Sequence, residues 1–306
     1  MSVTPLSAAP EPSNRATPAA PRSPKGIASA RITMESLDLS TPDPGLFGPT
    51  SVSWRVHHDP AAVVGGIRAL FLQSLHPEVM LGFHGITGTR DDPWGRLART
   101  GSYVNAITYG TEAEAETAAA RVRRVHASLK LDRPEWLLWV HCGAVESWLA
   151  GHRRSGAAMT DAEADAYVEE QVTAARLIGC TIADVPRTVA QLEAYFVEMR
   201  PRLEVTPEAR EAGRGLLWPP MATRLEWLTP ARPAWTTLAV TGFALMPRWA
   251  RRMFALPALP TTDLSATVSA RTLRAVLLAV PDEKRTNPHL AAARLRLGIT
   301  QERAAS

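Results

Sequence analysis

The sequence predicts an all-α protein, folded as a single compact domain of many helices behind a disordered N-terminal tail. Two observations carry this prediction. Helix-start signals, in which a capping residue precedes proline or stands three residues before glutamate, recur along the chain. No segment shows the sustained alternation of apolar and polar residues, bounded by hairpin turns, that is typical of strands. A chain of 306 residues, 45% of them hydrophobic, can bury the core of one such domain.

The tail is predicted over residues 1–44, which contain eight prolines and no aromatic residue. Such a segment cannot build a hydrophobic core, so we expect it to be disordered. Phe47 is the first aromatic residue, and the helical domain is expected over residues 45–306. Residues 1–31 hold four basic residues against one acidic residue, without a dense Lys/Arg run. This pattern indicates a solvated tail rather than a segment that binds nucleic acid.

The first three predicted helices each begin at a capping residue. Asp59-Pro60 opens a helix to about residue 83, and Pro77 is expected to kink or split it. After a Gly/Thr loop over 84–90, Asp92-Pro93 opens the second helix, which runs to about residue 109. The third begins at the capping box of Thr111 and Glu114 and runs to about residue 129.

The later helices follow the same logic. Pro134 starts a fourth helix to about residue 154, and the capping box of Thr160 and Glu163 starts a fifth that ends near residue 179. A sixth is expected over about 187–199, and Thr206-Pro207 opens a seventh. Two short helices within residues 234–254 are broken at Pro247, and a last long helix covers about 262–280.

Several enzyme classes are excluded by motifs that the sequence lacks. It has no GxGxxG dinucleotide fingerprint, no phosphate-binding GxxxxGK[ST], no GxSxG, no HExxH and no Glu-x-x-His pair of a di-iron bundle. Cys142 and Cys180 lie in apolar helical patterns without zinc-ligand spacing, so buried thiols are expected. A helical chain with these absences either binds an organic cofactor such as haem or is not an enzyme.

No stretch reaches about 18 uninterrupted apolar residues, so no membrane span is expected. The N-terminus has neither an apolar signal region nor a twin-Arg pair. A cytoplasmic protein is therefore the expectation.

The strongest local pattern lies in the second helix. Arg96, Arg99, Thr100 and Tyr103 stand at i, i+3, i+4 and i+7 and therefore share one face. Desolvated arginines need anionic partners, such as the propionates of a haem. The alternative is that both arginines pair with Asp91, Asp92 or more distant carboxylates at the surface.

Two histidines occupy apolar faces of the neighbouring predicted helices. His126 shares a face with Ala119, Val122 and Leu129, whereas His141 lies in the apolar segment Leu137–Cys142. Such histidines are usually core residues with a hydrogen-bond partner, but neutral imidazole is also the commonest protein ligand of haem iron. Spacing alone leaves both interpretations open.

Together these segments resemble the latex-clearing-protein (rubber oxygenase)/MpaB oxygenase family, from about Phe47 to about residue 280. The order and number of the similar segments make the resemblance specific. They are Leu46-Phe47-Gly48-Pro49 with Trp54-Arg55-Val56, Ala69-Leu70-Phe71-Leu72-Gln73-Ser74-Leu75-His76-Pro77, Asp92-Pro93-Trp94-Gly95-Arg96-Leu97, Val122-Arg123-Arg124-Val125-His126, Leu138-Trp139-Val140-His141 and Leu245-Met246-Pro247-Arg248-Trp249.

The resemblance implies an all-α fold that encloses a b-type haem with one proximal histidine. His126 matches that iron ligand by its place in the arginine-rich helix, with His141 as the second choice, and Tyr103 is grouped with the cofactor-binding residues. Rubber oxygenases carry Arg, Lys and Thr on the distal side at i, i+3 and i+4. Arg96 and Thr100 match the first and last of these, but Arg99 stands where the lysine is expected. Arginine stays protonated and cannot ligate iron, so lysine capping of the iron is not expected here.

The resemblance therefore implies a haem b-dependent oxygenase in which Arg96, Arg99 and Thr100 are catalytic and His126 binds the iron. The expected partners are an apolar small molecule and O₂ or a peroxide, with oxidative C=C cleavage as one outcome. Polyisoprene is not expected as substrate, because the chain lacks a recognisable export signal. The alternatives are a non-catalytic helical protein that binds haem or a lipophile, and a purely structural protein in which both histidines are core residues.

Overall fold

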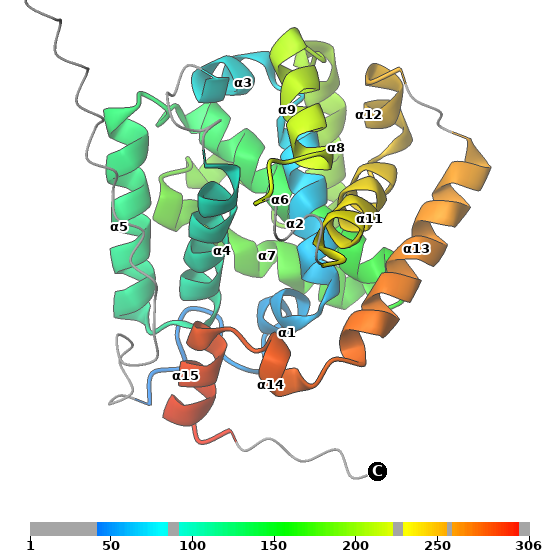
Figure 1. The fold of residues 1–306 in the computed structure, drawn as a ribbon. Coiled ribbons are helices and arrows are strands. Elements are labelled where there is room, and N and C mark those ends of the chain that lie inside the picture. Colours follow the sequence, from blue (N-terminus) through cyan, green and yellow to red (C-terminus); the bar gives the residue numbers. More distant parts are fainter. Residues whose placement is uncertain (1–41, 85–91, 223–228, 256–258, 300–306) are drawn as a thin grey trace, which may run out of the picture. The chain divides into compact units, whose positions relative to one another are not determined.

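The computed structural model describes residues 42–84, 92–222, 229–255 and 259–299, all of which belong to one unit spanning residues 32–306. The described residues form helices, turns and loops and no strand, which confirms the all-α prediction (Figure 1). The predicted disordered tail (1–44) lies almost entirely outside the described residues, and so does the predicted loop over 84–90.

The helices follow one another along the chain with short connections. Two single turns of 3-10 helix, η2 (Ile182–Asp184) and η3 (Arg200–Arg202), flank α8. The α-helices are α1 (Val52–His58), α2 (Ala61–Gln73), α3 (Pro77–His84), α4 (Pro93–Tyr109), α5 (Glu112–Ser128), α6 (Pro134–Arg154), α7 (Asp161–Ile178), α8 (Val189–Met199), α9 (Pro207–Leu217), α11 (Ala231–Ala244), α12 (Arg248–Met253), α13 (Pro260–Leu278), α14 (Asp282–Arg285) and α15 (Pro288–Arg296).

The helices that carry the candidate site have the predicted bounds because their ends are set by local chemistry. The Asp92 carboxylate caps α4 by accepting a hydrogen bond from the backbone N–H of Gly95 at 2.7 Å. Both predicted capping boxes, at the starts of α5 and α7, are formed. The α7 helix ends at Gly179, whose φ of 95° falls in the left-handed region that favours glycine. The expected break at Pro77 is also confirmed, since it separates α2 from α3.

Three short helices were not predicted: α1, α14 and α15. The α1 helix has seven residues, too few for a hydrophobic period to stand out, although the Ser51 hydroxyl caps it at the backbone N–H of Trp54. The α15 helix begins after Asn287, whose side chain accepts a hydrogen bond from the backbone N–H of Leu290 at 3.0 Å. The predicted last long helix over 262–280 is confirmed as α13, and the two short helices α14 and α15 follow it among the described residues.

The α2 helix packs against α6 on one side and α11 on another, and glycines allow the close approach. A Cβ atom on Gly65 would lie 3.0 Å from the Ser147 carbonyl oxygen of α6. On the other side, a Cβ atom on Gly242 of α11 would lie 3.2 Å from the backbone nitrogen of Arg68. Both contacts are tighter than ordinary packing, so larger residues would push these helices apart.

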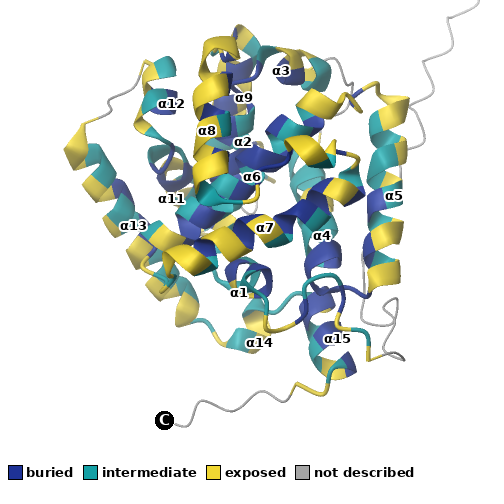
Figure 2. Cartoon of the chain, turned by 180° about the vertical axis from the view of Figure 1, so that it is seen from behind, coloured by how far each residue is buried: buried dark blue, intermediate teal, exposed yellow. Residues whose placement is uncertain are grey.

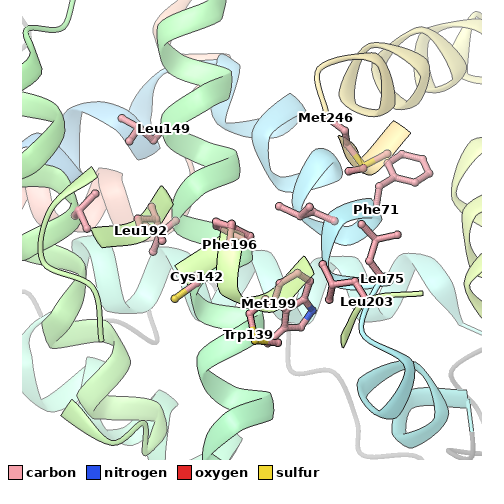
Figure 3. Close-up of a cluster of buried hydrophobic side chains, with 14 of the residues drawn as sticks. Phe71, Leu75, Trp139, Cys142, Leu149, Leu192, Phe196, Met199, Leu203 and Met246 are labelled. Atoms are coloured by element: carbon pink, nitrogen blue, oxygen red, sulfur yellow. The ribbon is translucent and has the colours of Figure 1, made fainter. Parts of the chain in front are cut away.

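The main hydrophobic cluster fills the space between these helices and α7, α8 and α12 (Figure 3). Trp139 of α6 is fully buried there, and its ring lies 5.6 Å from that of Phe196. Figure 2 shows that the buried residues lie on the inner sides of the helices. Cys142 and Cys180 are free and buried, which confirms their prediction as thiols.

One buried charged group links α2, α6 and the loop before α12. The guanidinium of Arg68, which is 1% exposed, donates to the Glu146 carboxylate at 2.8 Å and to the Ser147 hydroxyl at 2.6 Å. It also donates to the Leu245 carbonyl oxygen at 3.0 Å. A buried charge needs such complete pairing, so these contacts fix the spacing of the three segments.

None of the described helices combines the length and the hydrophobicity that a bilayer-crossing segment requires.

Candidate functional site

The first turns of α4 place Arg99 and Thr100 at the protein surface. Arg99 forms an ion pair with Asp92 at 3.2 Å, and both side chains are about half exposed. The Thr100 side chain is also exposed. For Arg99, the alternative raised by the sequence, a surface ion pair with Asp92, is the one observed.

Arg96 is in a different environment from Arg99. It is only partly exposed, and its guanidinium carbon lies 4.4 Å from the centre of the Phe83 ring at the end of α3. Burial lowers the pKa of Arg96, and the neighbouring charge of Arg99 lowers it further. No carboxylate among the described residues forms an ion pair with Arg96. It is therefore a partly desolvated cation that could receive an anion.

Tyr103, two turns further along α4, faces α5 and α7. It packs against the cluster of Ile107, Ala119 and Leu177. Its hydroxyl oxygen is buried and has no hydrogen-bond partner among the described residues. Burial raises the pKa of Tyr103. The hydroxyl is thus a neutral donor that a bound group could satisfy.

The pairing of α4 with α5 brings the N-terminal end of α4 beside the C-terminal end of α5 (Figure 1). Only Gly110 and Thr111 connect the two antiparallel helices. Residues at similar distances from this connection therefore lie at similar heights along the two helix axes. Arg96 lies in the first turn of α4 and His126 in the last turn of α5, so both belong to the same end of the pair.

His126 lies in the last turn of α5 and is partly buried. Its Nδ1 atom is buried and has no hydrogen-bond partner among the described residues. Burial lowers the pKa of His126, and Asp132 acts in the opposite direction. The expected apolar stripe around it is incomplete, because Leu129 is 40% exposed. His126 is therefore a neutral imidazole near the surface with an unsatisfied ring nitrogen.

His141 lies on α6 and is buried. Burial lowers the pKa of His141 to about 4, so its ring is neutral at physiological pH. None of the described residues forms a hydrogen bond with the ring. Glu146 points elsewhere, as expected, because it pairs with Arg68. His141 thus meets the same chemical requirement for a ligand as His126, but in a more enclosed position.

Arg96, Arg99 and Thr100 lie in the first turns of α4 and His126 lies in the last turn of α5, but no hydrogen bond, ion pair or ring contact among the described residues joins His126 or His141 to the α4 residues. No set of three or more metal-ligating side chains is found among the described residues. Two hollows in the described part of the chain are lined by other residues. One lies beside α12 and α13, and the second lies between Pro134 and Asp184.

Sequence reasoning missed a second group of polar residues, where α1, α6 and α7 meet. The Tyr167 hydroxyl and the His57 Nε2 atom are 3.3 Å apart, and the His57 ring packs against Trp148 at 4.5 Å. Nearby, His152 is 2% exposed and neither of its ring nitrogens has a hydrogen-bond partner among the described residues. These residues are too far apart in sequence to form a motif, and α1 itself was not predicted.

Phe83 was also missed as the partner of Arg96. The candidate residues nevertheless fit a haem in their chemistry. A haem needs a neutral nitrogen ligand for its iron and cationic or hydroxyl groups near its charged and polar atoms. His126 offers an unsatisfied ring nitrogen, Arg96 a cation without a carboxylate among the described residues, and Tyr103 an unsatisfied hydroxyl.

Comparisons with known proteins give one match. The family model described as "ER-bound oxygenase mpaB/B'/Rubber oxygenase, catalytic domain" matches residues 54–277. Among the curated proteins and the solved structures, nothing matches the chain. The matched span includes α2 to α12, almost all of α13, and every candidate residue described above.

Proposed function

Because the chain belongs to the family of the ER-bound oxygenase mpaB/B' and rubber oxygenase catalytic domain, we propose that it is a haem b-dependent oxygenase that acts on an apolar small molecule. The observation that carries the proposal is the unsatisfied ring nitrogen of His126, at the same end of the α4–α5 pair as the partly desolvated Arg96. A buried polar atom without a partner is costly, and a bound group would remove that cost.

In this proposal His126 holds the haem and His141 is the second candidate. A haem supplies the iron that activates O₂ or a peroxide. Iron binds the neutral form of imidazole, and burial lowers the pKa of both histidines, so neither must lose a proton first at neutral pH. Tyr103 would donate its free hydroxyl to a polar atom of the bound cofactor.

Arg96, Arg99 and Thr100 are proposed to be the catalytic residues, which would act on the oxygen species and the substrate once the cofactor is bound. A fixed cation stabilises negative charge that develops during oxygen chemistry. Arg96 suits this role best, because it is partly desolvated, lies over the Phe83 ring and has no carboxylate partner among the described residues. Arg99 is held by Asp92 in a half-exposed position, so its contribution should be smaller.

A second candidate function is non-catalytic binding of haem or a lipophile. The exposure of Arg99 and Thr100 favours it, because two of the three proposed catalytic side chains contact solvent. If the bound molecule is haem, the two functions share this cofactor. They then differ in that only the oxygenase needs a cation near the haem.

The first test is the absorbance spectrum of the purified protein, expressed with an adequate supply of haem. We expect a Soret band and close to one haem per chain, because neutral imidazole ligates haem iron strongly. A colourless protein that takes up no added haem would overturn the proposal and favour a structural role for both histidines.

Arg96→Ala separates the oxygenase from the carrier. Loss of one preorganised donor typically lowers the rate about 10²–10³-fold. We therefore expect the variant to bind haem normally but to bleach an apolar polyene, supplied with O₂ or hydrogen peroxide, about 100-fold more slowly. Arg99→Ala should lower the bleaching rate less than Arg96→Ala does. Arg124→Ala, which removes an exposed arginine of α5, should leave the bleaching rate unchanged. Unchanged bleaching by Arg96→Ala would favour the carrier.

A further inference from the structure

The α13 helix is apolar on two opposite sides. Its inner side packs against α2, α6 and α11, and Ala266 and Ala270 are buried there beside Val64 of α2. Its outer side carries Leu264 and Val268, which are 66% and 54% exposed. A helix that is apolar on both sides is usually covered on both sides, so the outer side calls for a partner.

Most exposed apolar residues of α13 lie on one side of the helix, where the exposed Arg271 interrupts them between Val268 and Ala275. Leu264, Val268, Ala275 and Leu278 fall within about 80° of one another around the helix axis, at 100° per residue. Val276 flanks them and is 60% exposed. Figure 2 shows exposed positions along the length of α13. We call this surface, made of Leu264, Val268, Ala275, Val276 and Leu278, the outer face of α13.

The exposed charged residues of α12 and α13 are all arginines, whereas α14, which follows, also exposes Glu283. Arg271 is the only charged residue among the exposed residues of this helix, and Arg252 of α12 is also exposed. The one carboxylate of α13, Asp263, is held by Arg248 and Arg251. The apolar face therefore contains one exposed cation, Arg271, and neither α12 nor α13 carries an exposed carboxylate.

A hollow of about 460 Å³ opens beside Leu264 and adds to the positive charge. Its lining includes Arg154, Arg248 and Asp263. The Arg154 guanidinium donates to the Leu245 and Asp263 carbonyl oxygens and to the Thr267 hydroxyl, and it has no carboxylate partner among the described residues. Two arginines against one carboxylate leave the hollow with a net positive charge.

We propose that the outer face of α13 binds to the surface of a membrane that contains anionic lipids. Exposed Leu and Val side chains would enter the boundary between headgroups and acyl chains, while Arg252 and Arg271 contact lipid phosphates. The hollow beside Leu264 would receive a headgroup. A second copy of the chain fits less well, because pairing two such faces would bring arginine against arginine without a carboxylate to offset the charge.

Vesicle co-sedimentation of the full chain tests this proposal. The probes are vesicles of phosphatidylcholine alone and vesicles of phosphatidylcholine with about 30% phosphatidylglycerol. We expect binding to the anionic vesicles that weakens with salt, and weak binding to phosphatidylcholine alone. The double variant Leu264→Glu with Val268→Glu should abolish binding. The double variant Arg252→Gln with Arg271→Gln should weaken it about 25-fold, since each cation near such a surface contributes roughly fivefold.

The matched control is Val197→Glu on α8, because Val197 is 56% exposed, nearly the same as Val268, and α13 packs mainly against α2, α6 and α11. This variant should bind vesicles as the parent chain does. Unchanged binding by the Leu264/Val268 variant, or no binding to either vesicle, would overturn the proposal. A dimer in sedimentation velocity that the Leu264/Val268 variant abolishes would assign the face to a second copy instead.

Discussion

Replacing His126 by alanine should abolish haem binding. His126 provides an unsatisfied ring nitrogen at the same end of the α4–α5 pair as Arg96, and its loss leaves no imidazole on either of these two helices. Changes in the groups that merely orient a metal ligand already cost about 10–100-fold in affinity, so removal of the ligand itself should leave almost no haem at micromolar concentrations. The measurement is the Soret absorbance per chain, with haem extracted and quantified separately.

Two further variants make this result interpretable. His84→Ala removes an exposed histidine at the end of α3 and should leave haem content unchanged. Added imidazole should restore a Soret band to His126→Ala, because the free ligand can occupy the space that the ring leaves. If His126→Ala keeps its haem and His141→Ala loses it, the ligand is His141 on α6.

Acid should destabilise the protein through its buried histidines. Burial lowers the pKa of His57 to about 3, with the neighbouring His152 acting in the same direction, and lowers the pKa of His141 to about 4. Below pH 6.5 the unfolded chain binds protons at these rings while the folded chain does not. The free energy of unfolding therefore decreases as the pH is lowered. When the pH is lowered from about 6.5 to about 5, each ring reduces the free energy of unfolding by about 2 kcal/mol, and the two rings together reduce it by about 4 kcal/mol.

Urea unfolding at about pH 7 and pH 5 measures this loss. His57→Gln keeps a hydrogen-bonding side chain beside Tyr167 but cannot gain a proton, so the difference between the two pH values should shrink by about 2 kcal/mol. The exposed His84→Gln variant should retain the full difference. A parent chain equally stable at both pH values would contradict the prediction.

The sequence predicted the long helices well because their ends depend on local chemistry. Asp92, Thr111 and Thr160 cap α4, α5 and α7 by contacts within three residues of themselves, and such contacts can be read from sequence. The α1 and α15 helices escaped prediction, since they are short and packing stabilises them. Trp54 of α1 and Leu290 of α15 belong to one buried cluster, although 236 residues separate them (290 − 54).

The candidate site was predicted only in part, because sequence spacing gives a shared helix face but not its surroundings. Arg96 and Arg99 have the same spacing pattern, yet one lies over Phe83 and the other pairs with Asp92 at the surface. Their difference depends on where α3 ends relative to α4. The two histidines could not be ranked either, since both lie on apolar faces and only tertiary packing sets how far each is enclosed.

The pairing of Arg68 with the Leu245 carbonyl oxygen has a consequence for how the chain reaches its native state during synthesis. The two residues are 177 positions apart, so α2 leaves the ribosome long before the segment that completes its hydrogen bonds. At about 5–20 residues per second this interval lasts on the order of ten seconds or more. Glu146 and Ser147 of α6 can pair with the cation earlier, but its third partner is missing until α11 has been made, so the final packing of α2 waits for that segment.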